Sequence, residues 1–320
     1  MTALHDTNGA AVVIGGGLAG LMTALALAPQ RVLLLSSAPF GLETSSILAQ
    51  GGIAASIGSD DDASLHLADT LAAGDGLCDE AVAAAILAGA PAAIDRLLQL
   101  GVLFDRDADG NLALGLEAAH SRRRIVHAGG DASGRDIIRT LARRVYETPS
   151  ITVHEATRAQ RLIVEDNTVR GVVCQTERDP VVFVTDRVVI ATGGIGGLFL
   201  HGTNPAGSCG QGLALAARAG AILADLEFIQ FHPTALDTGS FPLKLVSEAV
   251  RGEGAILVDE NGERFMAHTP GAELAPPPRT LTELPVTVTG TDTGTLASPA
   301  DGVVAAVASA VAAAETVGSA

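Results

Sequence analysis

The chain contains 320 residues, with 20 Lys and Arg against 36 Asp and Glu, so its formal net charge is −16. This length allows about two domains and a core that needs no disulfide or metal to hold it. The acidic balance argues against a nucleic-acid partner, because phosphate binding requires clustered basic side chains. The three Cys are an odd number at wide spacings, which indicates a reducing compartment and no zinc site.

The apolar stretch 9–28 raises the question of a membrane helix or a signal peptide, in keeping with the positive mean hydropathy of +0.36. A signal peptide begins with basic residues, yet no Lys or Arg precedes Arg31. A spanning helix would hardly carry four glycines in its middle. We therefore expect a soluble, cytoplasmic chain with no membrane partner.

This stretch instead predicts a dinucleotide-binding unit. The run 10–14 is typical of a parallel strand covered on both faces, and GGGLAG, a helical pattern and a second buried strand over 32–35 follow it. G-x-G-x-x-G between strand and helix is the context that the motif requires. Gly15 would allow the tight turn, Gly17 the approach of a pyrophosphate, and Gly20 close packing of helix on sheet. The helix N-terminus would attract the phosphates.

The acidic residue that usually binds a ribose after the second strand is missing. Ser36 and Ser37 stand there instead, and a hydroxyl binds ribose or phosphate less strongly than a carboxylate does. Farther on, the buried strand 188–190 runs into ATGGIGG. A strand that returns to the nucleotide sheet after other structure indicates a discontinuous domain.

Elsewhere, periodicity predicts further helices and short strands. The acidic run 60–62 is interpreted as the solvated N-terminus of a helix, and 80–100 as one or two helices broken near Pro91. The segment 228–234 fits a strand or the edge of a loop, and 259–264 fits a hairpin turn. The other expected elements are helices over 64–73 and 133–146 and strands over 151–154, 161–164, 169–173 and 181–184.

Three consecutive Arg, at 122–124, stand out in so acidic a chain. One interpretation is a solvated basic turn that pairs with the acidic surface. The other is a local positive pocket for an anionic ligand, with Glu117 and His120 as titratable neighbours. His232, between Gln230 and Thr234, is a further candidate polar site, although a lone His is more often a structural residue.

These motifs, in this order, resemble the flavoprotein family of L-aspartate oxidase, succinate dehydrogenase and fumarate reductase. The resemblance covers about residues 9–276. It implies an α/β fold, with a Rossmann-like FAD-binding domain over 1–230 and an inserted α+β substrate-capping domain that starts over 231–275. The matching pieces are 15–20, 49–54, 117 with 120–124, 191–194, 203–205, 231–234 and 248–254.

The resemblance implies FAD as the dinucleotide. In membrane-complex members, a His four residues before the Ala of the AQGG motif bonds covalently to the flavin; here Ser45 stands there, which implies non-covalent FAD. Three departures from the family weaken the implied FAD contacts without removing them: Ala118 and Ala119 stand where the family usually has two Gly, Ser37 replaces a usual Lys, and Gln211 replaces a usual Asp. The residues implied to bind FAD are Gly15, Gly16, Gly17, Leu18, Ala19, Gly20, Ser36, Ser37, Ser45, Ser46, Ala49, Gln50, Gly51, Gly52, Thr192, Gly193 and Gln211.

Within the family, the L-aspartate oxidases are most similar, because Glu117 precedes the His-Ser-Arg-Arg-Arg run. That carboxylate is thought to meet the α-amino group of the substrate. The similarity implies oxidation of L-aspartate to iminoaspartate by hydride transfer from Cα to flavin, reoxidation by O2 or fumarate, and delivery of the product to quinolinate synthase for NAD biosynthesis. The implied catalytic residues are Glu117, His232 and Arg279, and the implied substrate-binding residues are His120, Gln230, Ser247 and Glu248.

The similarity to the family stops near Pro276. Where the family continues with its catalytic Arg, Pro277 and Pro278 intervene, and Arg279 stands two places late. We expect 276–320 to be a non-family tail, a linker followed by a marginal Ala-rich helix. One alternative is therefore a truncated, catalytically inactive FAD-binding fragment. Another is a soluble fumarate reductase-like enzyme, although Glu117 and Ser45 argue against it.

Overall fold

The structure is a computed structural model. It describes residues 3–39, 42–117 and 119–230, followed by 232, 234–236, 239–247, 250, 255–258, 261–264 and 286–287. The expected helix near the C-terminus and most of the proposed tail lie outside these residues. The proposed domain boundaries stay predictions.

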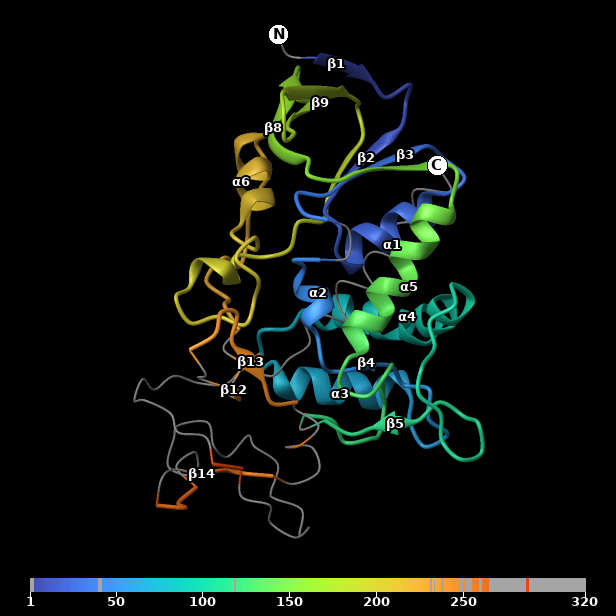
Figure 1. Ribbon diagram of the computed structural model, residues 1–320. Helices are drawn as coiled ribbons and strands as arrows, with labels where there is room; N and C mark the ends of the chain where they lie inside the picture. The colour runs from blue at the N-terminus through green and yellow to red at the C-terminus, as the bar shows by residue number, and fades with distance from the viewer. Residues whose placement is uncertain are drawn as a thin grey trace.

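The fold contains a four-stranded parallel sheet, which lies in the upper half of the view in Figure 1. Ile14 lies opposite both Leu35 and Ile190, so the late strand does return to the nucleotide sheet, as predicted. The strand 151–154, predicted beside the other short strands, pairs instead with the second strand of this sheet. The order is β11 (Val188–Ile190), β2 (Ala11–Ile14), β3 (Val32–Leu35) and β7 (Ile151–His154).

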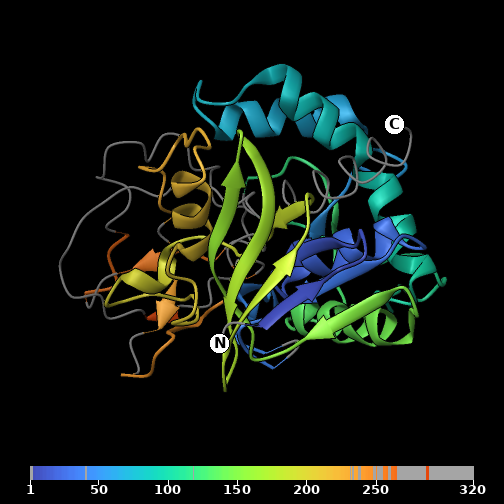
Figure 2. The same ribbon diagram turned by 90° about the horizontal axis from the view of Figure 1, so that it is seen from above.

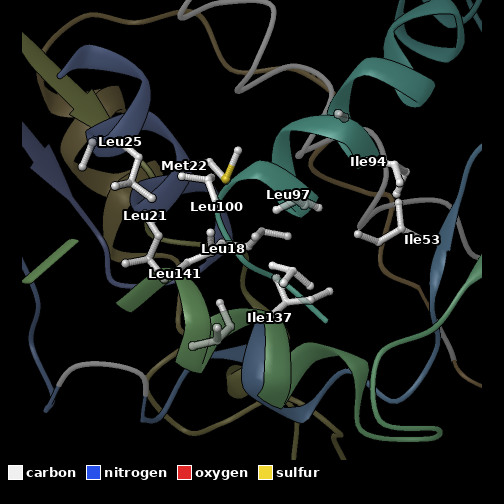
Figure 3. Packing of buried hydrophobic residues seen from close by; sticks show 14 of the residues in the cluster. Leu18, Leu21, Met22, Leu25, Ile53, Ile94, Leu97, Leu100, Ile137 and Leu141 are labelled. Atoms are coloured by element: carbon white, nitrogen blue, oxygen red, sulfur yellow. The ribbon is translucent and has the colours of Figure 1, made fainter. Parts of the chain in front are cut away.

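Helices cover one face of this sheet. Val13 and Leu34 point to α1 (Leu18–Leu27) and α5 (Ser133–Glu147), which lie side by side, and the second half of α4 (Glu80–Gln99) joins them. Burial of this face is the main stabilising contribution, at about 25 cal/mol per Å² of apolar surface. Figure 3 shows Leu18, Leu21, Met22, Leu25, Ile53, Ile94, Leu97, Leu100, Ile137 and Leu141 in this cluster.

A second sheet covers the other face. Val12 and Leu33 point the opposite way from their neighbours and pack with Val172, Phe183 and Leu215, as the period of two in a strand requires. Figure 2 shows this second sheet between α6 and the parallel sheet. Its order is β1 (Ala3–Asp6), β10 (Pro180–Val184), β9 (Thr168–Gln175) and β8 (Arg158–Glu165), with α6 (Gln211–Arg218) against β8. The strand β1 was not predicted from the sequence.

The helix predicted to break near Pro91 is a single helix, α4. Its buried side chains lie on both sides of the proline, from Leu87 to Leu97. Packing of that continuous face keeps the helix intact despite the lost backbone hydrogen bond. Within the described residues, α4 is also the one helix that is long and apolar enough to cross a membrane, judged by length and composition alone.

Short elements complete the described chain. The segment 228–230 is irregular, so it is a loop and not a strand. Of the hairpin turn expected over 259–264, residues 259 and 260 lie outside the described residues, whereas Asn261 lies in a turn and Gly262 has a φ of +81°. Before this turn, β14 (Leu257–Val258) pairs in parallel with β15 (Val286–Thr287). The others are α2 (Ser45–Leu48), β4 (Ile53–Ala54), α3 (Ala63–Ala73), β5 (Leu114–Gly115), β6 (Ile125–Val126), a 3-10 turn (Gly196–Leu198), β12 (Ala235–Leu236) and β13 (Lys244–Leu245).

Candidate functional site

In the glycine-rich turn after β2, two of the glycines have no space for a side chain and a third does. Gly15 has a φ of +126°, and a Cβ there would overlap with the carbonyl of Ala191. A Cβ on Gly20 would overlap with the carbonyl of Gly15. At Gly17 the nearest atom to an added Cβ would be Ser46 Oγ, at 3.3 Å. Gly15 and Gly20 thus serve turn and packing, as predicted, whereas Gly17 leaves backbone accessible to a ligand.

The N-terminus of α1 is suited to an anion. Gly17 is its N-cap and supplies no side-chain hydrogen bond, and the Leu18 N–H donates to Ser46 Oγ at 3.2 Å. The N–H groups of Ala19 and Gly20, in the first turn, have no intrahelical acceptor. Together with the helix dipole they form an environment that favours a phosphate.

The two serines after β3 differ in their surroundings. Ser36 is buried, and its hydroxyl donates to the carbonyl of Ala38 at 2.8 Å. Its backbone N–H donates to the carbonyl of His154. Ser36 therefore stabilises the loop and offers a ligand only an acceptor, while Ser37 is exposed at the same edge of the sheet.

The segment that contains the AQGG motif is fixed at both ends. The Ser45 hydroxyl donates to Asn204 Oδ1 at 2.7 Å and lies 3.4 Å from Ser208 Oγ, and the Gly134 N–H donates to the carbonyl of Ala49 at 3.0 Å. In the residue that follows Ala49, Gln50 Oε1 is buried without a hydrogen-bond partner among the described residues. A buried polar atom of this kind requires a partner, which a bound cofactor can supply.

The carboxyl ends of β2 and β11 bring a third segment to this edge. The Ala191 N–H donates to the carbonyl of Ile14 at 2.8 Å. Gly193 has a φ of +72°, and nothing lies within 4 Å of the position of its Cβ. Thr192 packs closely on Gly212, next to Gln211 at the start of α6. Ligands of open parallel sheets bind at this edge.

Glu117 reaches the AQGG segment. Its Oε1 lies 3.2 Å from where a Cβ on Gly51 would stand, and the N–H of His120 donates to the Glu117 carbonyl at 3.1 Å. A side chain on Gly52 is excluded for another reason, because its Cβ would overlap with the carbonyl of Val126. The structure therefore places a carboxylate and an imidazole in one turn beside a cofactor segment predicted from the sequence.

Neither interpretation of the arginine run holds for Arg124. Its side chain is fully buried, with Nε and Nη2 donating to the two carboxylate oxygens of Asp61 and Nη1 to Asp69 Oδ2, each at 2.8 Å. It is thus unavailable to a ligand. Arg122 lies near the surface, 4.0 Å from Asp60. An open pocket beside it includes this carboxylate, so its lining is not purely basic: Asp60, Leu116, Ser121, Arg122 and Arg123.

An acidic and an imidazole partner of this turn lie on α3 and were not among the residues predicted from the sequence. His66 is buried, and its ring lies 5.5 Å from that of His120. Burial lowers the pKa of His66 to about 4, with a further contribution from Arg124. Burial and Arg124 also hold the pKa of His120 below its ordinary value. The available signal was Asp69, the one charged residue in the apolar pattern of α3.

The other predicted site residues are partly described. The Thr234 N–H donates to His232 Nδ1 at 3.3 Å, and the Thr234 hydroxyl donates to the carbonyl of Val246 at 3.0 Å. Thr234 thus connects His232 to Val246, the residue before Ser247 in the chain. Gln230 is exposed. Glu248 and Arg279 lie outside the described residues.

Residues 10–299 match a family model described as a FAD binding domain. The chain belongs to this family. FAD is therefore the cofactor implied for it, and the open backbone at Gly17 and Gly193 and the buried Gln50 Oε1 fit such a group. The mixed α/β fold with a parallel sheet agrees with that assignment.

Alignments with curated relatives cover most of this chain. An L-aspartate oxidase of Agrobacterium fabrum is 61% identical over 264 residues, which cover 82% of this chain and 51% of the relative. One of Mesorhizobium japonicum is 60% identical over 276 residues, 86% of this chain and 54% of the relative. The chain spans about half the length of the curated relatives it matches.

Solved structures share the fold. An E. coli quinol fumarate reductase FrdA variant has a TM-score of 0.77 at 29% identity, covering 83% of this chain and 45% of that one. Mycobacterium smegmatis Sdh1 has a TM-score of 0.72 at 33% identity, covering 80% and 46%. The resemblance to the succinate dehydrogenase and fumarate reductase flavoproteins, inferred from sequence motifs, is thus confirmed in three dimensions.

Proposed function

We propose that this chain oxidises L-aspartate to iminoaspartate, with non-covalent FAD as cofactor and O2 or fumarate as electron acceptor. The observation that carries the proposal is the position of Glu117, whose carboxylate lies against Gly51 of the AQGG segment. The relatives from Agrobacterium fabrum and Mesorhizobium japonicum, both named L-aspartate oxidase, support the same substrate.

The cofactor would be held mainly by backbone groups. Gly17 and the first turn of α1 would receive the pyrophosphate, Ser36 and Ser37 would lie near the ribose, and Gln50 would bond a polar edge of the ring system. When bound, FAD supplies a two-electron acceptor. Ser45 takes the place of a covalently linked His, and its hydroxyl bonds Asn204.

The protein's task is to recognise and orient a small dianion with one ammonium group. Glu117 would pair with the ammonium, since a carboxylate is the natural partner of a cation. His120, His232 and Ser247 would donate hydrogen bonds to the two carboxylates. Oxidation of the Cα–N bond removes a hydride from Cα and a proton from the ammonium. Fixing that ammonium on Glu117 therefore orients the reacting Cα.

The negative charge of Glu117 would also let the site distinguish L-aspartate from succinate. Succinate carries the two carboxylates without the ammonium, so Glu117 would face it with a negative charge that nothing on the substrate neutralises. We therefore favour aspartate over a fumarate reductase-like activity. The product would be consumed by quinolinate synthase in NAD biosynthesis, and the chain would act in the cytoplasm.

A visible spectrum of the purified chain with FAD, before and after anaerobic L-aspartate, tests the proposal. Bleaching of the bound flavin by L-aspartate, but not by D-aspartate or succinate, is the expected result. Bleaching by succinate alone would support the fumarate reductase-like alternative. If the bound flavin stays oxidised with every substrate, the chain binds FAD but does not oxidise any of them.

A further inference from the structure

The contact between Arg124 and His120 determines which nitrogen of the imidazole carries a proton. Arg124 Nη1 lies 3.4 Å from His120 Nδ1 in hydrogen-bonding geometry. A guanidinium has five N–H donors and no acceptor, and it stays protonated in proteins. His120 cannot donate to it, so Nδ1 must hold a lone pair and accept.

The surroundings of Arg124 hold it in this orientation. The guanidinium binds both oxygens of Asp61, which is itself fully buried, and one oxygen of Asp69. Asp69 Oδ2 also accepts from the N–H and the hydroxyl of Ser121, the residue after His120. Arginine, imidazole and backbone are thus fixed relative to one another by two carboxylates.

The charges near the His120 ring favour its neutral form. Arg124 is the cation in direct contact with the ring, and it disfavours the imidazolium. Asp61 and Asp69 favour the imidazolium, but both carboxylates are bound by that same guanidinium. The ring of His66, on α3, is a titratable group that also packs against the His120 ring. Burial of the ring also disfavours the imidazolium, because the charged form loses its contact with water.

We propose that Arg124 is a positioning residue that holds His120 as the neutral tautomer protonated on Nε2. The part of this inference that concerns the ligand rests on the proposed function. With Nδ1 engaged, the ring presents an N–H donor to a substrate carboxylate, and it acts neither as a cation nor as a base. Charge recognition of L-aspartate is thereby divided, with Glu117 binding the ammonium and His120 contributing a neutral hydrogen bond.

Nitrogen NMR of the FAD-bound 320-residue chain, labelled with 15N-histidine, tests the tautomer without any substrate. We expect two-bond nitrogen–proton correlations that show Nε2 protonated and Nδ1 unprotonated at about neutral pH. An Nδ1–H tautomer or an imidazolium at that pH would overturn the proposal. Arg124→Lys, which keeps the charge and loses the fork geometry, should give a mixture of tautomers, whereas the matched variant Arg122→Lys should leave the spectrum unchanged.

A second pair of variants keeps the proposal testable if Arg124→Lys fails to fold. The amide nitrogen of Gln reaches the position of Nε2, and that of Asn the position of Nδ1. His120→Gln should therefore retain L-aspartate binding, measured by perturbation of the flavin spectrum, while His120→Asn should weaken it by about tenfold. Tighter binding by the Asn variant would overturn the donor assignment. Absence of L-aspartate binding in the unmodified chain, with the expected tautomer present, would count against the proposed function alone.

Discussion

Asp69 Oδ2 accepts hydrogen bonds from both the backbone N–H and the hydroxyl of Ser121, each at 2.8 Å. The two residues are 52 positions apart, on α3 and on the turn that carries Glu117 and His120. A helix that has no predicted role in the chemistry therefore sets the position of the turn.

Asp69→Asn should loosen that turn. The amide keeps one acceptor but removes the charge opposite the buried Arg124, so we expect the free energy of unfolding to fall by about 1–3 kcal/mol. Urea denaturation measures it. Asp75→Asn, at an exposed position after the same helix, should change stability by no more than about 0.5 kcal/mol. Equal losses in the two variants would contradict a specific role for Asp69.

Arg124→Met should be the most destabilising change in the arginine run. It leaves Asp61 buried without its cation, and breaking one partner of a buried pair costs about 3–5 kcal/mol. Arg122→Met removes an exposed pair with Asp60 and should cost less than about 1 kcal/mol. Thermal and urea unfolding of both variants provide the comparison, and similar midpoints would refute the buried ion pair.

Two glycine variants should separate folding from cofactor binding. Gly20→Ala forces a Cβ onto the Gly15 carbonyl, so we expect a loss of about 3 kcal/mol in stability. The Cβ of Gly17→Ala meets Ser46 Oγ at 3.3 Å and Thr44 Cβ at 3.9 Å. This variant should fold and yet bind FAD at least about tenfold more weakly, because the methyl group occupies pyrophosphate space. Circular dichroism and flavin content distinguish the two, and full flavin content in Gly17→Ala would remove that glycine from the site.

Glu117→Gln should weaken L-aspartate binding more than succinate binding. The amide preserves shape but loses the charge that pairs with the ammonium, which succinate lacks; charged hydrogen bonds of this kind contribute about 1.5–3 kcal/mol. The dissociation constants of both ligands follow from titration of the flavin spectrum. A parallel loss for both would exclude Glu117 from amine recognition.

Acid should destabilise the protein through His66. Its pKa is about 4 in the folded chain against about 6.5 when unfolded, so the unfolded state binds the extra proton between these values. Stability should therefore be fully present above about pH 6.5 and decline as pH falls toward 4. His66→Gln should flatten this part of the profile, and His201→Gln, at an exposed position, should leave it unchanged. If stability depends on pH in the same way in His66→Gln, His66 is not the cause of the loss of stability in acid.

The dinucleotide turn could be predicted because its signals are local. The strand, the three glycines and the helix lie within one stretch of sequence, and Gly20 packs on Gly15 of the same motif, although Gly15 and Gly17 contact Ala191 and Ser46 from other segments. The same holds for the β8–β9 hairpin, where Asp166 and Asn167 both have positive φ, as a two-residue turn of this kind requires.

The misjudged features depend on partners distant in sequence. Arg124 looks solvated or available because Asp61 and Asp69 belong to a separate segment, itself interpreted as a solvated helix start. Pro91 suggests a break because the buried face that maintains α4 is assembled only by packing. No local pattern assigns the strand 151–154 to the central sheet, since a parallel pairing with β3 leaves no turn signal between them.

The contact of Gly15 with Ala191 has a consequence for synthesis. The turn proposed to bind the pyrophosphate is completed by a strand that leaves the ribosome long after β2 and β3. Until then β2 presents an unpaired edge, which is the kind of surface that leads nascent chains to aggregate. A ribosome-bound chain arrested shortly before β11 should therefore be sensitive to proteolysis and dependent on chaperones, and release of the next few residues should protect both early strands together.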